Sequence, residues 1–340
     1  MWRYLFKRSI ISIFTIIGII IVVFFIVRIL PGDPALVRAG PYASEKKIKE
    51  IRVKYGLNDP LLDQFKDYFI KLIHFDLGTS IRTGGKVTDE LMERLPASLE
   101  LAFYGVLFSL ILGVPLGILG SAFKDSWIDW FVRVFAVFGS SMTFFWLGLM
   151  LTFFLFFKYQ WFPGPVGRLS IGRLPPDEIT SFFTFDALLQ GDFNLLIESF
   201  HYLSLPVITI GFVLSAPIIK IVRSAMIDSL ESEYVRTAKA VSIPYIQILF
   251  SYCFRNALLP ITTTVGIVFG YMLGGNIIVE LIFSWPGIGR YAYDAIRVND
   301  IEALQGFVII VGILYVILNV IIDLTYAWID PRIRLDGITK

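Results

Sequence analysis

The chain has 340 residues, of which 56% are hydrophobic and only 17% are charged, whereas roughly a quarter of the residues in an ordinary soluble domain are charged. This composition predicts an integral membrane protein rather than a soluble one. The net charge is +2, and the 30 basic residues are scattered among 28 acidic ones, so nothing in the charge pattern indicates binding to nucleic acid.

Six stretches of 18 to 24 residues contain no Asp, Glu, Lys or Arg. Each is close to the ~20 apolar residues that a helix needs to cross a hydrocarbon core of ~30 Å. We therefore predict an all-α membrane protein with six transmembrane helices. The stretches are Ser9–Val27, Leu101–Phe123, Val134–Phe157, Tyr202–Ile219, Asn256–Val279 and Ala303–Ile322.

The distribution of basic residues predicts the orientation. With the N-terminus inside, the inner pieces carry 13 Lys and Arg residues, against five in the short outer pieces 158–201 and 280–302. Because basic residues favour the cytoplasmic side, both termini should be cytoplasmic. The first apolar stretch is longer than the ~7–15 residues of a signal-peptide core, and no small-residue cleavage site follows it, so it should remain as an uncleaved span.

The predicted spans divide the chain into four parts. They are the N-terminus with the first span (1–27), an extracytoplasmic cap loop (28–100), a transmembrane core (101–335) and a cytoplasmic tail (336–340). The core includes an outer loop, 158–201, and an inner loop, 220–255. In the cap loop, apolar spacing predicts amphipathic helices over 44–55 and 61–75. None of the pieces between spans reaches the ~100 residues of a usual domain, so an energy source would have to come from a partner.

No pattern in the sequence indicates an enzyme. The two histidines, His74 and His201, lie in separate loops without metal-ligand spacing. The sequence lacks a nucleophile elbow and a phosphate-binding loop. The single cysteine, Cys253, excludes an internal disulfide and is expected to be a small buried residue. We predict a non-enzymatic chain that holds no metal or cofactor of its own.

Five residues in or beside the last two spans are candidates for a transport path or gate. Gly266, Gly270 and Gly274 recur every four residues, so they share one helix face. That face is either a site of close helix packing or a smooth wall beside a path. Glu280 and Asp323 lie at span ends, where a carboxylate either forms a structural ion pair or takes part in transport.

The inner loop 220–255 gives the strongest functional signal. Residues 228–241 are compatible with a charged helix, and Ser242-Ile243-Pro244 should break it, with Pro244 opening a second helix. The polar positions surround the first helix, so it should dock on another protein. Its expected groove-facing residues are Tyr234, Ala238 and Val241, and its expected rim residues are Glu233, Arg236 and Lys239.

This segment resembles the EAA motif of permease subunits of ATP-driven, binding-protein-dependent importers. Glu233, Thr237, Ala238 and Ala240 fit its first part and Leu259-Pro260 its end, while Ser242 replaces the usual glycine. Further motifs are similar to the peptide/nickel permease family: RILPGDPA (28–35), GLNDPLLDQF (56–65), DLGTSIRTGGKVTDELMERLPASLELA (76–102), FSWPGIGRYAYDAI (283–296) and DLTYAWIDPRIRL (323–335). GRLS (167–170), FDALLQGD (185–192) and HYLSLP (201–206) look most like the di- and oligopeptide permeases.

The resemblance implies the six-span fold of a type I importer permease in a prokaryotic cytoplasmic membrane. It implies pairing with a second, similar permease, two cytoplasmic ATPases that bind ATP and Mg, and an extracytoplasmic binding protein that delivers a peptide. Residues 233–243 would form the coupling helix, and the resemblance assigns ATPase coupling to Glu233, Tyr234, Arg236, Thr237, Ala238, Ala240, Ser242 and Pro244.

Several alternatives stay open at this point. Related importers carry nickel, glutathione or oligosaccharides. A proton-coupled secondary transporter is disfavoured because the spans contain no buried acidic residues and the sequence shows no inverted repeat. A membrane receptor or assembly protein that uses only its outer cap is the third alternative.

Overall fold

The computed structural model describes residues 2–29, 35–36, 43–54 and 56–329, and this part of the chain is helical, with no strand beyond one isolated bridge between Thr79 and Lys86. The α-helices are α1 (Trp2–Ile29), α3 (Glu45–Lys54), α4 (Leu61–Ile73), α5 (Val87–Ala122), α6 (Trp127–Ser141), α7 (Phe144–Leu151), α8 (Phe183–Gln190), α9 (Phe193–Leu230), α10 (Glu233–Ala240), α11 (Tyr245–Gln247), α12 (Arg255–Gly275), α13 (Ile277–Ile282), α14 (Ile288–Arg297) and α15 (Ile301–Ile329). Two π-helical segments, η1 (Thr152–Lys158) and η2 (Ile248–Phe254), follow α7 and α11. The predicted all-α fold is confirmed.

Within the described residues, four helices are long and apolar enough to cross a membrane: 87–122, 193–230, 245–272 and 301–325. The bent pair formed by α6 and α7–η1 gives a fifth if it is counted as one span. α1 holds a shorter apolar stretch, Ile10–Ile26. The structure thus supports four or five spans by length and composition, and the count of six stays a prediction.

The third predicted span is not the single helix expected over Val134–Phe157. The chain bends by 100° between α6 and α7. Met142 is extended there, and the side chain of Thr143 accepts a hydrogen bond from the Trp146 backbone N–H at 3.3 Å, so α7 begins with its own cap. An uncharged sequence continues across the bend, which is why hydropathy alone did not reveal it.

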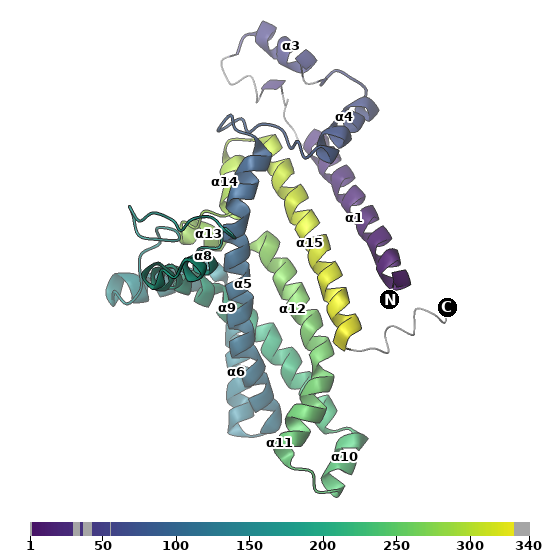
Figure 1. Ribbon diagram of the computed structural model, residues 1–340, viewed down its shortest axis with the longest axis vertical. Coiled ribbons are helices and arrows are strands. Elements are labelled where there is room, and N and C mark those ends of the chain that lie inside the picture. The colour runs from purple at the N-terminus through teal and green to yellow at the C-terminus, as the bar shows by residue number, and fades with distance from the viewer. Residues whose placement is uncertain (1, 30–34, 37–42, 55, 330–340) are drawn as a thin grey trace.

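The long helices pack side by side around α9 and α5, which share the most extensive contact in the described chain (Figure 1). Two glycines of α5 allow this close approach. A Cβ on Gly113 would lie 2.7 Å from Ile218 Cγ2, and one on Gly117 would lie 2.6 Å from Val222 Cβ. α12 contacts both α9 and α15, and α15 contacts α1.

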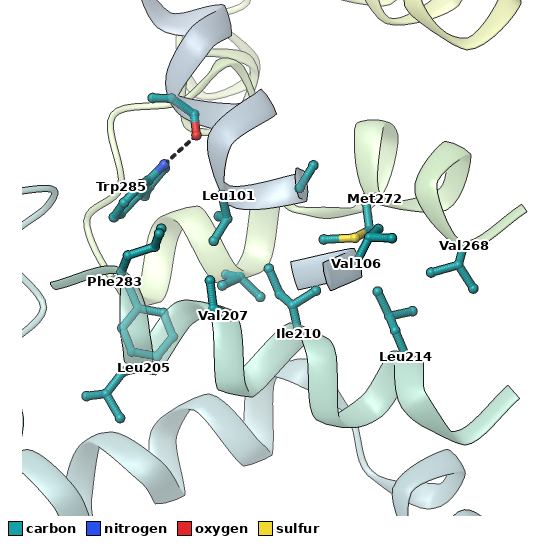
Figure 2. Packing of buried hydrophobic residues seen from close by; sticks show 14 residues of the cluster. Leu101, Val106, Leu205, Val207, Ile210, Leu214, Val268, Met272, Phe283 and Trp285 are labelled. Carbon is teal, nitrogen blue, oxygen red and sulfur yellow. Dashed lines mark hydrogen bonds between the residues drawn. The ribbon is translucent and has the colours of Figure 1, made fainter. Parts of the chain in front are cut away.

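A buried cluster fills the space between α5, α9, α12 and α13 (Figure 2). Leu101 and Ile210 lie at its centre, each no more than 1% exposed. Trp285 closes one end and donates a hydrogen bond from its indole N–H to the carbonyl of Ala97 at 2.8 Å. Such close packing gains van der Waals contacts, which favour the association of helices even where the surrounding lipid is as apolar as the side chains.

The two ends of the molecule differ. α3 and α4 lie at one end and α10 and α11 at the other (Figure 1). α1 begins, and α15 ends, toward the α10 end. The predicted helices of the cap loop are present as α3 and α4, but α5 begins at Val87, so the last part of 28–100 is helix rather than loop.

Candidate functional site

α10 projects from the end of the molecule on a buried base. Val235 is fully buried and Ala238 is 4% exposed, and both pack in one cluster with Met226 of α9 and with Leu249 and Cys253 of η2. The cluster anchors the short helix to α9, a long apolar helix, and to η2, which continues into α12. Cys253 is buried, as expected.

The outward face of α10 differs from the predicted one at Ala238. This residue was expected to enter a partner's groove together with Tyr234 and Val241, but it packs against its own chain because it lies three residues from Val235, on the same helix face. The exposed positions of the helix and its C-terminal end are Glu233, Tyr234, Arg236, Thr237, Lys239, Ala240 and Val241.

Tyr234 is the best-anchored residue on the exposed face. Its hydroxyl makes a hydrogen bond with the Ser229 hydroxyl and accepts another from Asn256 Nδ2 at 2.9 Å. The phenol therefore joins the ends of α9 and α12, while 41% of the residue stays exposed. Beside it, Arg236 and Glu233 form an exposed ion pair at 2.9 Å, which is worth little in free energy and leaves both charges accessible to a partner.

Ser242 ends α10 in a left-handed conformation, with φ +59°. Its N–H bonds to the carbonyl of Lys239 at 3.0 Å and the N–H of Ile243 to that of Ala238 at 3.1 Å, which is the Schellman pattern of helix termination. A glycine would adopt this φ without steric cost. Pro244 lies one residue before α11 rather than opening it, and its carbonyl accepts from Gln247 at 2.9 Å.

An ion pair that the sequence analysis missed braces the α10 end. Asp129 of α6 is fully buried and accepts bonds of 2.5 and 2.8 Å from the guanidinium of Arg223 in α9. Close by, Lys124 pairs with Glu231 just after α9. No local spacing could have indicated these pairs, because their members are separated by about a hundred residues.

The three predicted path glycines are not equivalent. A Cβ on Gly266 would lie 2.2 Å from Ile322 Cδ1, and one on Gly270 would lie 2.5 Å from Tyr315 Cε2, so both glycines face α15. A Cβ on Gly274 would meet no atom within 4 Å in the described part of the chain. Gly266 and Gly270 thus serve close helix packing, and the position of Gly274 leaves a role beside a path as a prediction.

Glu280 is a buried link between three elements. It is 1% exposed and accepts hydrogen bonds from Ser98 Oγ of α5 at 2.6 Å and from the Arg290 backbone N–H of α14 at 2.8 Å. Ser98 in turn accepts from the Ile288 N–H at 2.9 Å. The carboxylate therefore caps the start of α14, where a negative charge is favoured. A role of Glu280 as a gate stays a prediction.

Burial disfavours the ionised form of the Glu280 carboxyl group. Glu280 lies in the short α13, outside the four long apolar helices, and burial raises the pKa of its carboxyl to about 7. The hydrogen bonds from Ser98, Arg290 and Gly289 act in the opposite direction. Close packing isolates the group, because a Cβ on Gly287 would lie 2.4 Å from the Glu280 carboxyl carbon.

Asp323, the other carboxylate at a span end, pairs with Arg8 of α1. Its side chain is 13% exposed and that of Arg8 35%. The contact joins the last part of α15 to the first part of α1. This ion pair gives Asp323 a structural function within the chain, and its part in a path stays a prediction.

A second buried ion pair holds the loop after η1 to the helices. Glu100 is 1% exposed and binds Arg168 Nη2 at 2.5 Å and both the N–H and the hydroxyl of Thr184, at 3.0 and 2.6 Å. The guanidinium carbon of Arg168 stacks 3.4 Å above the Phe183 ring centroid. Because α5 carries Glu100 and α8 carries Thr184, the pair fixes the start of α8 on α5.

An apolar hollow of about 410 Å³, open to the surroundings, lies at the bend between α6 and α7. Its lining residues are Phe138, Ser141, Met142, Thr143 and Trp146, so no predicted path residue lines it. In the described part of the chain, no group of three or more His, Cys, Asp or Glu residues is arranged to hold a metal ion.

Comparison with known proteins identifies the class. Residues 113–335 match the family described as binding-protein-dependent transport system inner membrane component, and residues 1–102 match the N-terminal segment of such membrane components. The chain belongs to this family of inner-membrane transport proteins.

Curated relatives match over almost the whole chain. The probable D,D-dipeptide transport system permease protein DdpB of Escherichia coli K12 is 40% identical over 336 residues, which cover 99% of this chain and 98% of that protein. The dipeptide transport system permease protein DppB of Alkalihalophilus pseudofirmus OF4 is 36% identical, with 98% and 100% covered. Its counterpart in Escherichia coli K12 is 33% identical, with 98% and 99% covered.

Proposed function

We propose that this chain is the permease subunit of an ATP-driven importer of di- or oligopeptides and forms half of its translocation path. The family and the three dipeptide permeases similar over the whole chain support the peptide as cargo. A second, similar permease would supply the other half. Importers of nickel, glutathione or oligosaccharide are the alternatives that share this architecture.

In this proposal the α10 end faces the cytoplasm and the α3–α4 end faces outward. Two ATPase subunits, which bind ATP and Mg, dock on α10, and an extracytoplasmic binding protein delivers cargo at the other end. The excess of Lys and Arg in the predicted inner pieces supports this orientation. Both termini then lie on the cytoplasmic side, since α1 begins and α15 ends toward α10. The six-span count includes α1 and the bent pair.

The observation that carries the proposal is that α10 has one buried face and one exposed face. One face is buried through Val235 and Ala238 against η2 and α9, while the other is free to bind a partner. Since 245–272 runs as one long apolar helix through η2 and α12, a displacement of α10 by an ATPase would move α12 and α9 with it. α10 thus couples ATP-driven closure of the ATPases to the path.

The test compares two alanines on opposite faces of the same helix. Ala240→Arg places a bulky cation on the exposed face and should reduce binding of the ATPases and peptide-dependent ATP hydrolysis in the reconstituted importer, while the melting temperature of the permease stays unchanged. Ala238→Arg forces the same side chain into a filled cluster, where overpacking alone costs about 1–3 kcal/mol, so it should lower the melting temperature.

Normal ATPase binding and normal uptake in Ala240→Arg would contradict α10 as the coupling element. Cargo is tested separately in the same proteoliposomes, with labelled dipeptide, Ni²⁺, glutathione and oligosaccharide offered to the co-purified binding protein. Uptake of the dipeptide alone supports the proposal, and uptake of another cargo in its place contradicts the assignment of a peptide.

A further inference from the structure

We propose that α4 is an interfacial helix that lies on the membrane, with Leu62 and Ile73 inserted among the lipids of the leaflet at the α3–α4 end. This function is separate from peptide import and does not depend on it. The proposal rests on the two faces of α4, on the depth at which it meets α1 and on its charge.

The apolar surface of α4 is wider than its contact with the rest of the chain. At about 100° per residue, Phe65 and Tyr68 lie on the side that packs against α1. Leu62 and Ile73 point in nearly the same direction further around the helix, at its apolar edge, one near each end of α4, and are 82% and 60% exposed. Water is a poor environment for two large aliphatic side chains that line the same edge of a fixed helix.

α4 packs against α1 within the uncharged stretch of α1, close to the point where that stretch ends. The ring of Phe24 is completely buried and packs edge-on against Phe65 with centroids 5.1 Å apart. Phe24 precedes the end of the uncharged stretch at Val27 by three residues, which is about 4.5 Å along a helix axis. An interfacial helix buries its apolar face roughly 5–10 Å into the boundary between headgroups and acyl chains. The contact therefore places α4 at that boundary.

The bilayer explains the exposed edge better than a protein partner does, because α1, against which α4 packs through Phe24, also exposes large apolar side chains around that residue. Val22, Phe25 and Ile26 of α1 are 54%, 43% and 51% exposed, as expected for side chains in contact with lipid. Beside Leu62 and Ile73, Lys66 can extend its ammonium toward the headgroups while its methylenes cover apolar surface. α4 carries two lysines and two aspartates, so apolar burial rather than attraction to anionic lipid should hold it in place.

The experiment measures the depth of single side chains in the full permease. The one native cysteine, Cys253, is buried and is replaced by serine. Single cysteines are then introduced by Leu62→Cys, Ile73→Cys and, as matched control, Asp67→Cys on the polar face of the same helix. Each variant is spin-labelled, reconstituted with its co-expressed partners in phosphatidylcholine nanodiscs, and examined for collisions with oxygen and with a water-soluble nickel chelate.

The ratio of oxygen to nickel collisions should be several-fold higher at positions 62 and 73 than at position 67. Equal ratios at all three positions would overturn the proposal. It is equally overturned if positions 62 and 73 collide freely with nickel until the extracytoplasmic binding protein is added, because that protein would then be the partner of this face. Unchanged melting temperatures of the labelled variants show that the fold is retained. The measurement requires neither peptide nor ATP, so its failure would leave the proposed import function standing.

Discussion

The Ser98 hydroxyl donates a 2.6 Å hydrogen bond to the carboxylate of Glu280, and this contact joins two residues 182 positions apart in the chain. Since Ser98 also accepts the N–H of Ile288 and Glu280 accepts that of Arg290, the pair fixes the start of α14 against α5. A buried carboxylate with several donors is a strong positional constraint, because any movement of α14 would leave polar groups unpaired.

We expect the stability of the permease to fall as pH rises across the titration range of Glu280. The pKa of this carboxyl is raised from 4.5 to about 7 in the folded protein, so between these values the folded state binds more protons than the unfolded state. The free energy of unfolding then decreases with rising pH, by about 3 kcal/mol in total at 1.36 kcal/mol per pKa unit. Melting temperatures in detergent between pH 5 and pH 8 measure this slope.

The variant Glu280→Gln removes the titrating group while keeping its shape, and its melting temperature should depend less on pH. Glu178→Gln, at an exposed position, is the matched control and should retain the parental slope. Equal slopes in the parent and in Glu280→Gln would show that another group causes the pH dependence.

The sequence showed that Glu280 follows an apolar stretch, but it could not show what surrounds it. Its partner Ser98 lies in a different predicted part of the chain, and nothing in the spacing of either residue connects them. The buried pairs Asp129–Arg223 and Glu100–Arg168 escaped prediction for the same reason. Hydropathy is a local property, whereas the contacts that satisfy a buried charge are set by the tertiary fold.

Alanine substitutions on α12 should distinguish, by their effect on stability, the two glycines that pack against α15 from Gly274. Gly270→Ala should destabilise most, because the new methyl meets the ring of Tyr315, and Gly266→Ala should destabilise less, because the terminal methyl of Ile322 can rotate away. The methyl of Gly274→Ala meets no neighbour among the described residues, so this variant should be neutral or stabilise by about 0.5–1 kcal/mol through reduced backbone entropy of the unfolded chain.

The measurement for the three glycine variants is thermal unfolding together with uptake in proteoliposomes. A loss of uptake in Gly274→Ala at unchanged stability would support the path role predicted for this position. Strong destabilisation by Gly274→Ala would contradict the open space around it.

The predicted charged helix over 228–241 contains α10, but its first residues belong to the end of α9, and one residue of the predicted docking face is buried. The charged stretch and the break at residues 242–244 are visible in the sequence, and the structure places the helix at Glu233–Ala240. The face of α10 that is left to bind a partner depends on which face packs against the rest of the chain, and here the packed face contacts η2 and α9. Val235 and Ala238 have the i, i+3 spacing that could have indicated a buried stripe.

Ser242→Gly should stabilise the protein. Ser242 holds φ +59°, which costs an L-residue roughly 1–2 kcal/mol, whereas glycine adopts it freely but loses more backbone entropy on folding. We expect a net gain on the order of 1 kcal/mol, measured as a rise in melting temperature, and a loss for Ser242→Val because β-branched residues tolerate this conformation poorly. A lower melting temperature for Ser242→Gly would contradict the strain assigned to the position.

A double-mutant cycle on Arg8 and Asp323 should distinguish a structural ion pair from a path residue. The two side chains are paired between α1 and α15, and Asp323 is the more buried. Arg8→Gln leaves that carboxylate without its cation, and Asp323→Asn weakens the attraction, so each single variant should lower the free energy of unfolding by about 1–3 kcal/mol. The double variant should cost less than the sum of the two, because a neutral amide pair can still form hydrogen bonds.

If the pair is purely structural, peptide uptake follows stability in all three variants and the double variant recovers both. If Asp323 also acts in the path, Asp323→Asn and the double variant lose uptake beyond their loss of stability, while Arg8→Gln does not.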